Sequence, residues 1–131
     1  MHRAIFILLA TITSAWCRAQ EQPGAVLRLE QDVIDLGAIE YESEATDSLK
    51  VYNDGTGPLV ITSIFTDCGC TVPSYSRAPI APGDSGTVAV RFISRGRAAG
   101  TFRKAVRIRS NAVPPNKVLF VTGRIKRPYR K

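Results

Sequence analysis

The chain has 131 residues, of which 44% are hydrophobic and 22% are charged, and its formal net charge is +7. This length leaves room for one domain of ordinary size, and the composition excludes disordered, collagen-like and membrane-embedded proteins. The charge is unevenly distributed, because residues 20–90 contain 11 acidic and 3 basic residues, whereas residues 91–131 contain 13 basic residues and no acidic residue.

The first segment, residues 1–19, is predicted to be an export signal. Arg3 is followed by an apolar run over residues 4–12 and by small residues up to Ala19, which is the pattern of a cleavable signal. The run is shorter than the roughly 20 apolar residues of a membrane span. Cleavage after Ala19 would start the mature chain at Gln20. In the alternative, Cys17 is a lipidated first residue, although the bulky Trp16 before it disfavours lipidation.

The mature protein is therefore expected to be exported, to the periplasm, the cell surface or the medium, without a transmembrane span. Cleavage would also remove His2, the only histidine of the chain. A mature chain without imidazole excludes Ser-His-Asp and Cys-His catalytic arrangements and histidine-containing zinc sites. We expect a protein that is not an enzyme and that carries no cofactor.

After a short extension at residues 20–24, turn residues divide the chain into seven short segments rich in β-branched residues. These predicted strands are Val26–Glu30, Val33–Leu36, Ser48–Tyr52, Leu59–Phe65, Thr87–Ile93, Thr101–Ser110 and Lys117–Ile125. Alternation in two of them places six apolar residues in the core: Val88, Val90, Phe92, Phe102, Val106 and Ile108. The sequence predicts an all-β, immunoglobulin-like antiparallel β-sandwich of about seven strands over residues 25–127, with a basic tail at residues 128–131.

Several short motifs occur in a characteristic order between Asp35 and Ile125. They are Asp35-Leu36-Gly37-Ala38-Ile39, Tyr52-Asn53-Asp54-Gly55-Thr56-Gly57-Pro58-Leu59-Val60-Ile61, Asp67-Cys68-Gly69-Cys70-Thr71-Val72-Pro73, Pro79-Ile80-Ala81-Pro82-Gly83-Asp84-Ser85-Gly86, and Gly100-Thr101-Phe102-Arg103-Lys104 leading to Ser110-Asn111. Through these motifs the chain resembles the bacterial domain-of-unknown-function family 1573. The resemblance implies an immunoglobulin-like sandwich similar to the domains of Hydin and major sperm protein, usually exported in Bacteroidetes-like bacteria. It implies no established activity and no catalytic residues to carry over.

A single glycine separates Cys68 from Cys70. Cα atoms two residues apart can lie within the roughly 4.4–6.8 Å that a disulfide needs, and an exported protein meets an oxidising compartment. A bridge across so small a loop suits redox exchange, and two thiolates could instead bind Cu(I). Alternatively, both cysteines are inert buried groups or a fixed clip. Asp67 argues against a reactive thiolate, because a nearby carboxylate raises the pKa of a thiol. No other metal site is predicted.

The basic residues near the C-terminus are the second candidate site. Alternation places Arg103, Arg107 and Arg109 on one face of a strand, opposite its core residues. With Lys126 and Arg127, which directly precede the basic tail, they are the predicted binding residues. Their predicted partner is another envelope protein or an anionic envelope polymer.

Nucleic acid is not an expected partner, because the protein is exported and the sequence shows no aromatic row beside the arginines. Two alternatives remain for the charge asymmetry. Basic and acidic strands could lie side by side and form cross-strand ion pairs within the domain, or the opposite poles could cause weak self-association. Pro128 should end the last strand and leave residues 129–131 exposed, as a solvated terminus or docked on an anionic surface.

The sequence thus favours an exported interaction or structural module of the cell envelope. The competing hypothesis is a thiol redox or Cu(I)-handling protein that uses Cys68 and Cys70.

Overall fold

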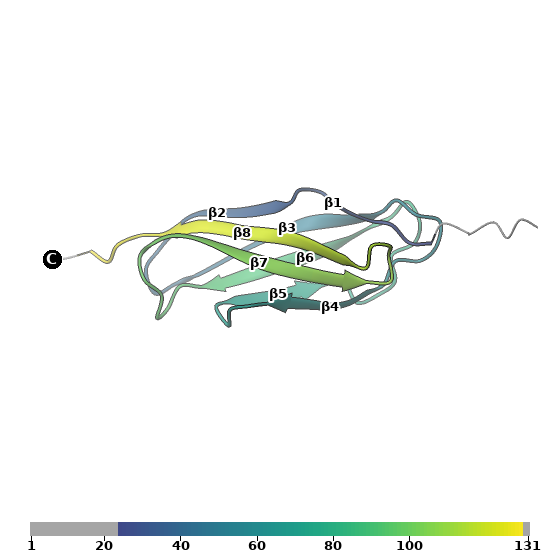
Figure 1. Cartoon of the computed structure of the whole chain (residues 1–131). Helices are drawn as coiled ribbons and strands as arrows, with labels where there is room; N and C mark the ends of the chain where they lie inside the picture. The colour runs from purple at the N-terminus through teal and green to yellow at the C-terminus, as the bar shows by residue number, and fades with distance from the viewer. Residues whose placement is uncertain (1–23, 130–131) are drawn as a thin grey trace, which may run out of the picture.

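Residues 24–129 form eight β-strands, which pack as two four-stranded sheets in a flattened sandwich (Figure 1). The computed structural model describes residues 24–129. The predicted export signal (residues 1–19), the cleavage position before Gln20 and the lipidation alternative at Cys17 lie outside the described residues, as do residues 130 and 131 of the tail. The predicted fold class, an all-β immunoglobulin-like sandwich, is confirmed.

Each sheet contains strands from distant parts of the chain. The first sheet has the order β1-β3-β6-β5 and consists of β1 (Leu27–Leu29), β3 (Glu44–Asn53), β6 (Ser85–Ile93) and β5 (Thr71–Tyr75). The second sheet has the order β2-β8-β7-β4 and consists of β2 (Val33–Ile39), β8 (Asn116–Ile125), β7 (Gly100–Ser110) and β4 (Ile61–Thr66). Within residues 24–129 there is no helix long and apolar enough to span a bilayer.

The described part of the chain contains one strand more than the seven segments predicted from the sequence. The additional strand, β5, is only five residues long and contains Pro73, which cannot donate a hydrogen bond to a ladder. β5 lies at the edge of its sheet and pairs only with β6, and an edge strand tolerates proline. The short length of β5 and its proline explain why the sequence does not predict this strand.

The sequence predicts antiparallel sheets, but β2 pairs in parallel with β8. The predicted strand ended at Leu36, whereas β2 continues to Ile39 after an irregularity between Asp35 and Ala38. There the N–H of Gly37 donates to the Asp35 carboxylate at 2.9 Å, and Gly37 has a φ of 67°, a conformation that glycine adopts without steric cost. This bulge interrupts the period-of-two pattern on which the prediction relied.

The core lies between the two sheets and contains the residues expected from alternation. Val88, Val90, Val106 and Ile108 are each 0% exposed. The sixth predicted core residue, Phe102, is half-buried, and its ring stacks on that of Phe92 with the centroids 4.0 Å apart. A smaller cluster at one end of the sandwich joins Phe92 to Ile39, Cys70 and Ile125.

The side chain of Asn53, at the end of β3, is completely buried. Its amide nitrogen donates to the carbonyl oxygens of Gly57 and Ile80, each at 2.8 Å. Its amide oxygen accepts from the N–H of Gly55 at 3.0 Å. Asn53 therefore ties the β3–β4 turn to the segment that precedes β6, which gives a physical reason for the turn motif that begins at Tyr52.

Candidate functional site

Strands β7 and β8 direct basic side chains to the outer surface of the second sheet. Arg103, Arg107 and Arg109 are exposed on β7, as predicted, and Arg124 is exposed on β8. Lys126 follows directly after β8 and is also exposed. We call the surface formed by these five residues the basic face. Arg124 was not among the predicted binding residues, although its spacing of two from Lys126 in an extended segment was the available signal.

Apolar side chains lie between these cations. The strand register pairs Arg107 with Phe65 of β4 on one side and with Val118 of β8 on the other. Directly paired residues project from the same side of a sheet, and Phe65 and Val118 are 54% and 42% exposed. The guanidinium carbon of Arg103 lies 4.0 Å from the ring centroid of Phe120. The sequence shows no aromatic row beside the arginines, whereas the structure brings two aromatic residues, Phe65 and Phe120, next to them from neighbouring strands.

Some of the opposite charges pair within the domain. Arg107 Nη1 lies 2.9 Å from Asp67 Oδ1, Arg91 Nη1 lies 3.5 Å from Glu44 Oε2, and Lys126 pairs with Glu40. The Arg107 and Asp67 side chains are 52% and 69% exposed, so this pair contributes at most about 1 kcal/mol to stability.

The ion pairs leave part of the basic face uncompensated. Among residues 24–129, Arg103, Arg109 and Arg124 have no carboxylate at ion-pair distance. The charges of these three arginines are therefore available to a partner. Of the three, only Arg103 also contacts an aromatic ring of the domain, that of Phe120.

A fourth ion pair lies away from this surface. Arg28 of β1 donates to the Asp54 carboxylate at 2.6 Å, and this hydrogen bond raises the pKa of Arg28 above its usual value. The same guanidinium stacks 4.3 Å from the ring centroid of Tyr52. This pair joins β1 to the end of β3 and takes no part in the basic face.

A cavity of about 460 Å³ opens at the end of the basic face. It lies between the start of β7 and the end of β8, and its lining residues are Ala99, Gly100, Thr101, Arg124, Ile125, Lys126 and Arg127. Three of these residues are cationic and none is acidic. The cavity therefore brings the predicted residues Lys126 and Arg127 together with Arg124, away from the arginines at the other end of β7.

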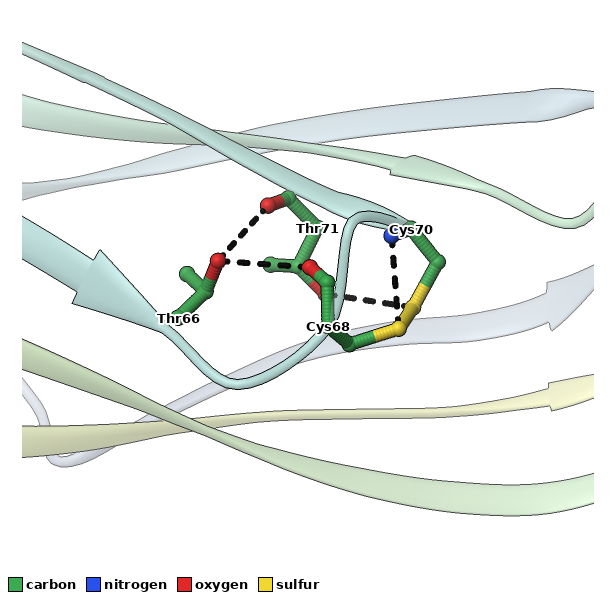
Figure 2. The surroundings of a disulfide bond; sticks show 4 residues. All are labelled: Thr66, Cys68, Cys70 and Thr71. Atoms are coloured by element: carbon green, nitrogen blue, oxygen red, sulfur yellow. Dashed lines mark hydrogen bonds between the residues drawn. A yellow bond between two sulfur atoms is a disulfide. The ribbon is translucent and has the colours of Figure 1, made fainter.

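The two cysteines lie in the turn between β4 and β5 and form a disulfide with an S–S distance of 2.02 Å and a Cα–Cα distance of 5.2 Å (Figure 2). Cys70 is buried, 3% exposed, whereas Cys68 is half-buried. The N–H of Cys70 donates to Cys68 Sγ at 3.3 Å, and Thr71 Oγ1 lies 3.7 Å from Cys70 Sγ. The two cysteines thus differ in exposure, and their sulfur atoms differ in hydrogen bonding.

Hydrogen bonds also close this turn independently of the sulfur atoms. The N–H of Thr71 donates to the carbonyl oxygen of Cys68 at 3.1 Å. The Thr66 hydroxyl donates to the carbonyl oxygen of Thr71 at 3.1 Å and lies 3.3 Å from that of Cys68 (Figure 2). The turn is further held to β6, because the N–H of Ile93 donates to the Cys70 carbonyl oxygen at 2.8 Å.

The oxidised pair bears directly on the Cu(I) hypothesis. A disulfide offers no thiolate, so Cys68 and Cys70 could bind Cu(I) only after reduction. The described residues, 24–129, contain no group of three or more histidine, cysteine, aspartate or glutamate side chains arranged to hold a metal ion. Binding, redox and copper roles of the predicted site residues all stay predictions at this point.

Solved structures share this fold at low sequence identity. A protein of unknown function from Porphyromonas gingivalis W83 has a TM-score of 0.69 and 19% identity, and the match covers 81% of this chain and 50% of that protein. The chain thus spans about half the length of the Porphyromonas protein. The ASH/PapD-like domain 7 of human CEP192 has a TM-score of 0.62 and 11% identity, covering 98% of this chain and 100% of that domain.

A third similar structure is the Vibrio cholerae protease VesB, with a TM-score of 0.58 and 13% identity over 82% of this chain and 32% of VesB. These likenesses show the fold alone. Comparison with curated proteins gives no match. The family model described as "Protein of unknown function (DUF1573)" matches residues 27–125, well over half of the chain, and the chain therefore belongs to this family.

Proposed function

We propose that the protein is an exported, non-catalytic binding module of the bacterial cell envelope, and that its basic face binds an acidic protein. The observation that carries the proposal is the set of uncompensated cations, Arg103, Arg109 and Arg124, on the same sheet surface as the exposed Phe65 and Val118. Arginine and aromatic residues are the types enriched in the core of protein interfaces. A non-catalytic role is supported by the absence of histidine from the expected mature sequence.

The apolar residues favour an acidic protein over an anionic polymer as the partner. A phosphate-rich polymer would satisfy the arginines but would give Phe65 and Val118 little apolar surface to contact. A protein surface can supply carboxylates at the rim and apolar side chains at the centre. The cavity at Arg124, Lys126 and Arg127 extends the same surface and offers a place for one carboxylate or carboxylate-bearing loop of that partner.

The first experiment identifies the partner by site-specific photo-crosslinking in the native envelope. A photoreactive residue replaces Val118 on the basic face or, as a matched control, Thr87, which is exposed on the outer surface of the opposite sheet. We expect a discrete protein adduct from position 118 and none from position 87. Adducts of anionic polymer alone would contradict the choice of a protein partner.

The contribution of the arginines to binding is then tested by measuring the affinity of protein variants for the isolated partner. The variant Arg109→Gln/Arg124→Gln should bind at least about tenfold more weakly, because two unpaired cations of the interface are lost. The control variant Lys50→Gln/Arg77→Gln removes the same charge at exposed positions outside the second sheet and should bind as the wild type does. Equal weakening by both variants would mean that net charge alone, and not the basic face, determines binding. The affinity should also fall as salt concentration rises.

A further inference from the structure

We propose that the Cys68–Cys70 disulfide is an exchange site for external thiols, in which the incoming thiolate attacks Cys68 Sγ and Cys70 leaves as the thiolate. The substrate class is a thiol or dithiol, of the kind that glutathione and dithiothreitol represent. This activity is separate from the binding proposed for the basic face, and it makes the turn between β4 and β5 a redox site.

The first argument is that the disulfide contributes little to the stability of the fold. It closes a loop with only Gly69 between the two cysteines, and a loop of this size removes little conformational entropy from the unfolded chain. The turn is already held by the Thr71 to Cys68 backbone hydrogen bond and by the Thr66 hydroxyl. A disulfide that stabilises the fold only slightly is correspondingly easy to reduce in the folded protein.

The second argument is the unequal access to the two sulfur atoms. Cys70 is 3% exposed and packs with Ile39, Phe92 and Ile125, whereas Cys68 is half-buried and precedes the exposed Gly69. Exchange requires a thiolate to reach the attacked sulfur. Cys68 is therefore the sulfur that an external thiolate can approach.

The third argument is that hydrogen-bond donors support the charge that exchange produces. A disulfide sulfur has no hydrogen, so the Thr71 hydroxyl is the donor in its 3.7 Å contact with Cys70 Sγ. It can donate to the thiolate that forms there when Cys70 leaves. The N–H of Cys70, 3.3 Å from Cys68 Sγ, can donate to the Cys68 thiolate that is released at the end of the reaction with a dithiol. A hydrogen bond to the charged form of a group favours that form.

The neighbouring carboxylate of Asp67 opposes this chemistry less than the sequence suggested. Asp67 was expected to raise the pKa of an adjacent thiol. In the structure its Oδ1 lies 2.9 Å from Arg107 Nη1, so the guanidinium compensates its charge. The repulsion between this carboxylate and a thiolate in the turn is correspondingly reduced.

The reaction balances with a thiol as the only co-reactant. The attack of a thiolate breaks the Cys68–Cys70 bond and forms a mixed disulfide on Cys68, and the electron pair of the broken bond stays on Cys70 Sγ, which later takes a proton from solvent. With a dithiol, the second thiolate attacks its own sulfur in the mixed disulfide and releases the Cys68 thiolate. The dithiol is then oxidised by two electrons, and the cysteine pair is reduced by two.

The test uses the full chain with Cys17→Ser, so that only this pair is counted. The oxidised, folded protein is treated with glutathione, quenched with acid, alkylated and mapped by tandem mass spectrometry. We expect glutathione on Cys68 and the alkyl group on Cys70, and we expect dithiothreitol to reduce the pair without denaturant. The inference is overturned if glutathione is found on Cys70, or if the pair reacts only in denaturant.

Two sets of variants keep the test decisive. Thr71→Val should slow the reaction with glutathione about threefold or more, because the donor to the leaving thiolate is lost, whereas Thr62→Val, an exposed position on β4, should leave the rate unchanged. In the single-cysteine chains, Cys70→Ser should react with oxidised glutathione at least about tenfold faster than Cys68→Ser, since it keeps the accessible thiol. Equal rates within both comparisons would refute the assigned roles of Thr71 and Cys68.

Discussion

At the scale of single residues, the buried side chain of Asn53 joins the β3–β4 turn to the segment before β6. Asn53 stands in a run of turn residues, and nothing in that run indicated that its side chain is 0% exposed and bonds to Gly57 and Ile80. Gly57 belongs to the same run, but Ile80 comes from a distant segment of the chain, and a local pattern carries no information about that contact. The alternation of Arg103, Arg107 and Arg109, by contrast, is a property of one strand and was predicted.

The Asn53 contacts predict a specific loss of stability. Asn53→Ala should lower the free energy of unfolding by about 2–3 kcal/mol, because buried backbone groups lose their hydrogen-bond partners. Lys50→Ala, at an exposed position of the same strand, should change it by less than about 0.5 kcal/mol. Urea denaturation followed by circular dichroism measures both, and similar losses in the two variants would contradict this role for Asn53.

At the scale of elements, strands were predictable where alternation is regular and were missed where it is interrupted. The bulge after Asp35 concealed the second half of β2, and Pro73 concealed β5. The pairing between strands could not be predicted, since register depends on contacts between distant segments. For this reason the arginine row was found, but its apolar neighbours Phe65 and Val118 were not.

The segment before β1 lies very close to the β3–β4 turn, and two glycine variants in this turn can test how tight the contact is. A Cβ added to Gly55 would lie 2.2 Å from the backbone oxygen of Gly24, whereas one added to Gly57 would meet no atom closer than 3.6 Å. Gly55→Ala should therefore displace the segment that leads into β1 and cost about 1–3 kcal/mol. Gly57→Ala should stay within about 0.5 kcal/mol of the wild type. Thermal unfolding compares them, and equal midpoints would show that this approach is not tight.

At the scale of the whole molecule, the charge asymmetry of the sequence is only partly resolved inside the domain. The pairs of Arg91 with Glu44, Arg107 with Asp67 and Lys126 with Glu40 are of the kind that the cross-strand alternative described. Other cations on the basic face stay uncompensated, which is why we favour a partner. Weak self-association between opposite poles stays a prediction, and sedimentation at low and high salt would measure it.

The proposed export has its own test in the intact mass of the protein isolated from the native envelope. We expect a chain that begins at Gln20 and carries no lipid, because Trp16 before Cys17 disfavours lipidation. Alkylation before and after reduction gives the state of Cys68 and Cys70 in the same measurement. A lipid mass on Cys17 would contradict the predicted cleavage position, and an uncleaved chain would contradict export.

The path of the chain through the sandwich also has a mechanical consequence. Gly24 lies at the end of the molecule where β3 finishes, since its carbonyl oxygen accepts from the N–H of Thr56. The chain leaves β8 at the opposite end, where the N–H of Lys126 donates to the carbonyl oxygen of Ile39 (Figure 1). A force that pulled these two ends apart would act along β1 and β8. The hydrogen bonds from β8 to β2 and β7 would then be loaded together in shear instead of opening one after another. The domain is thus built to resist stretching along its long axis, with a lifetime under load that depends on its rate of unfolding.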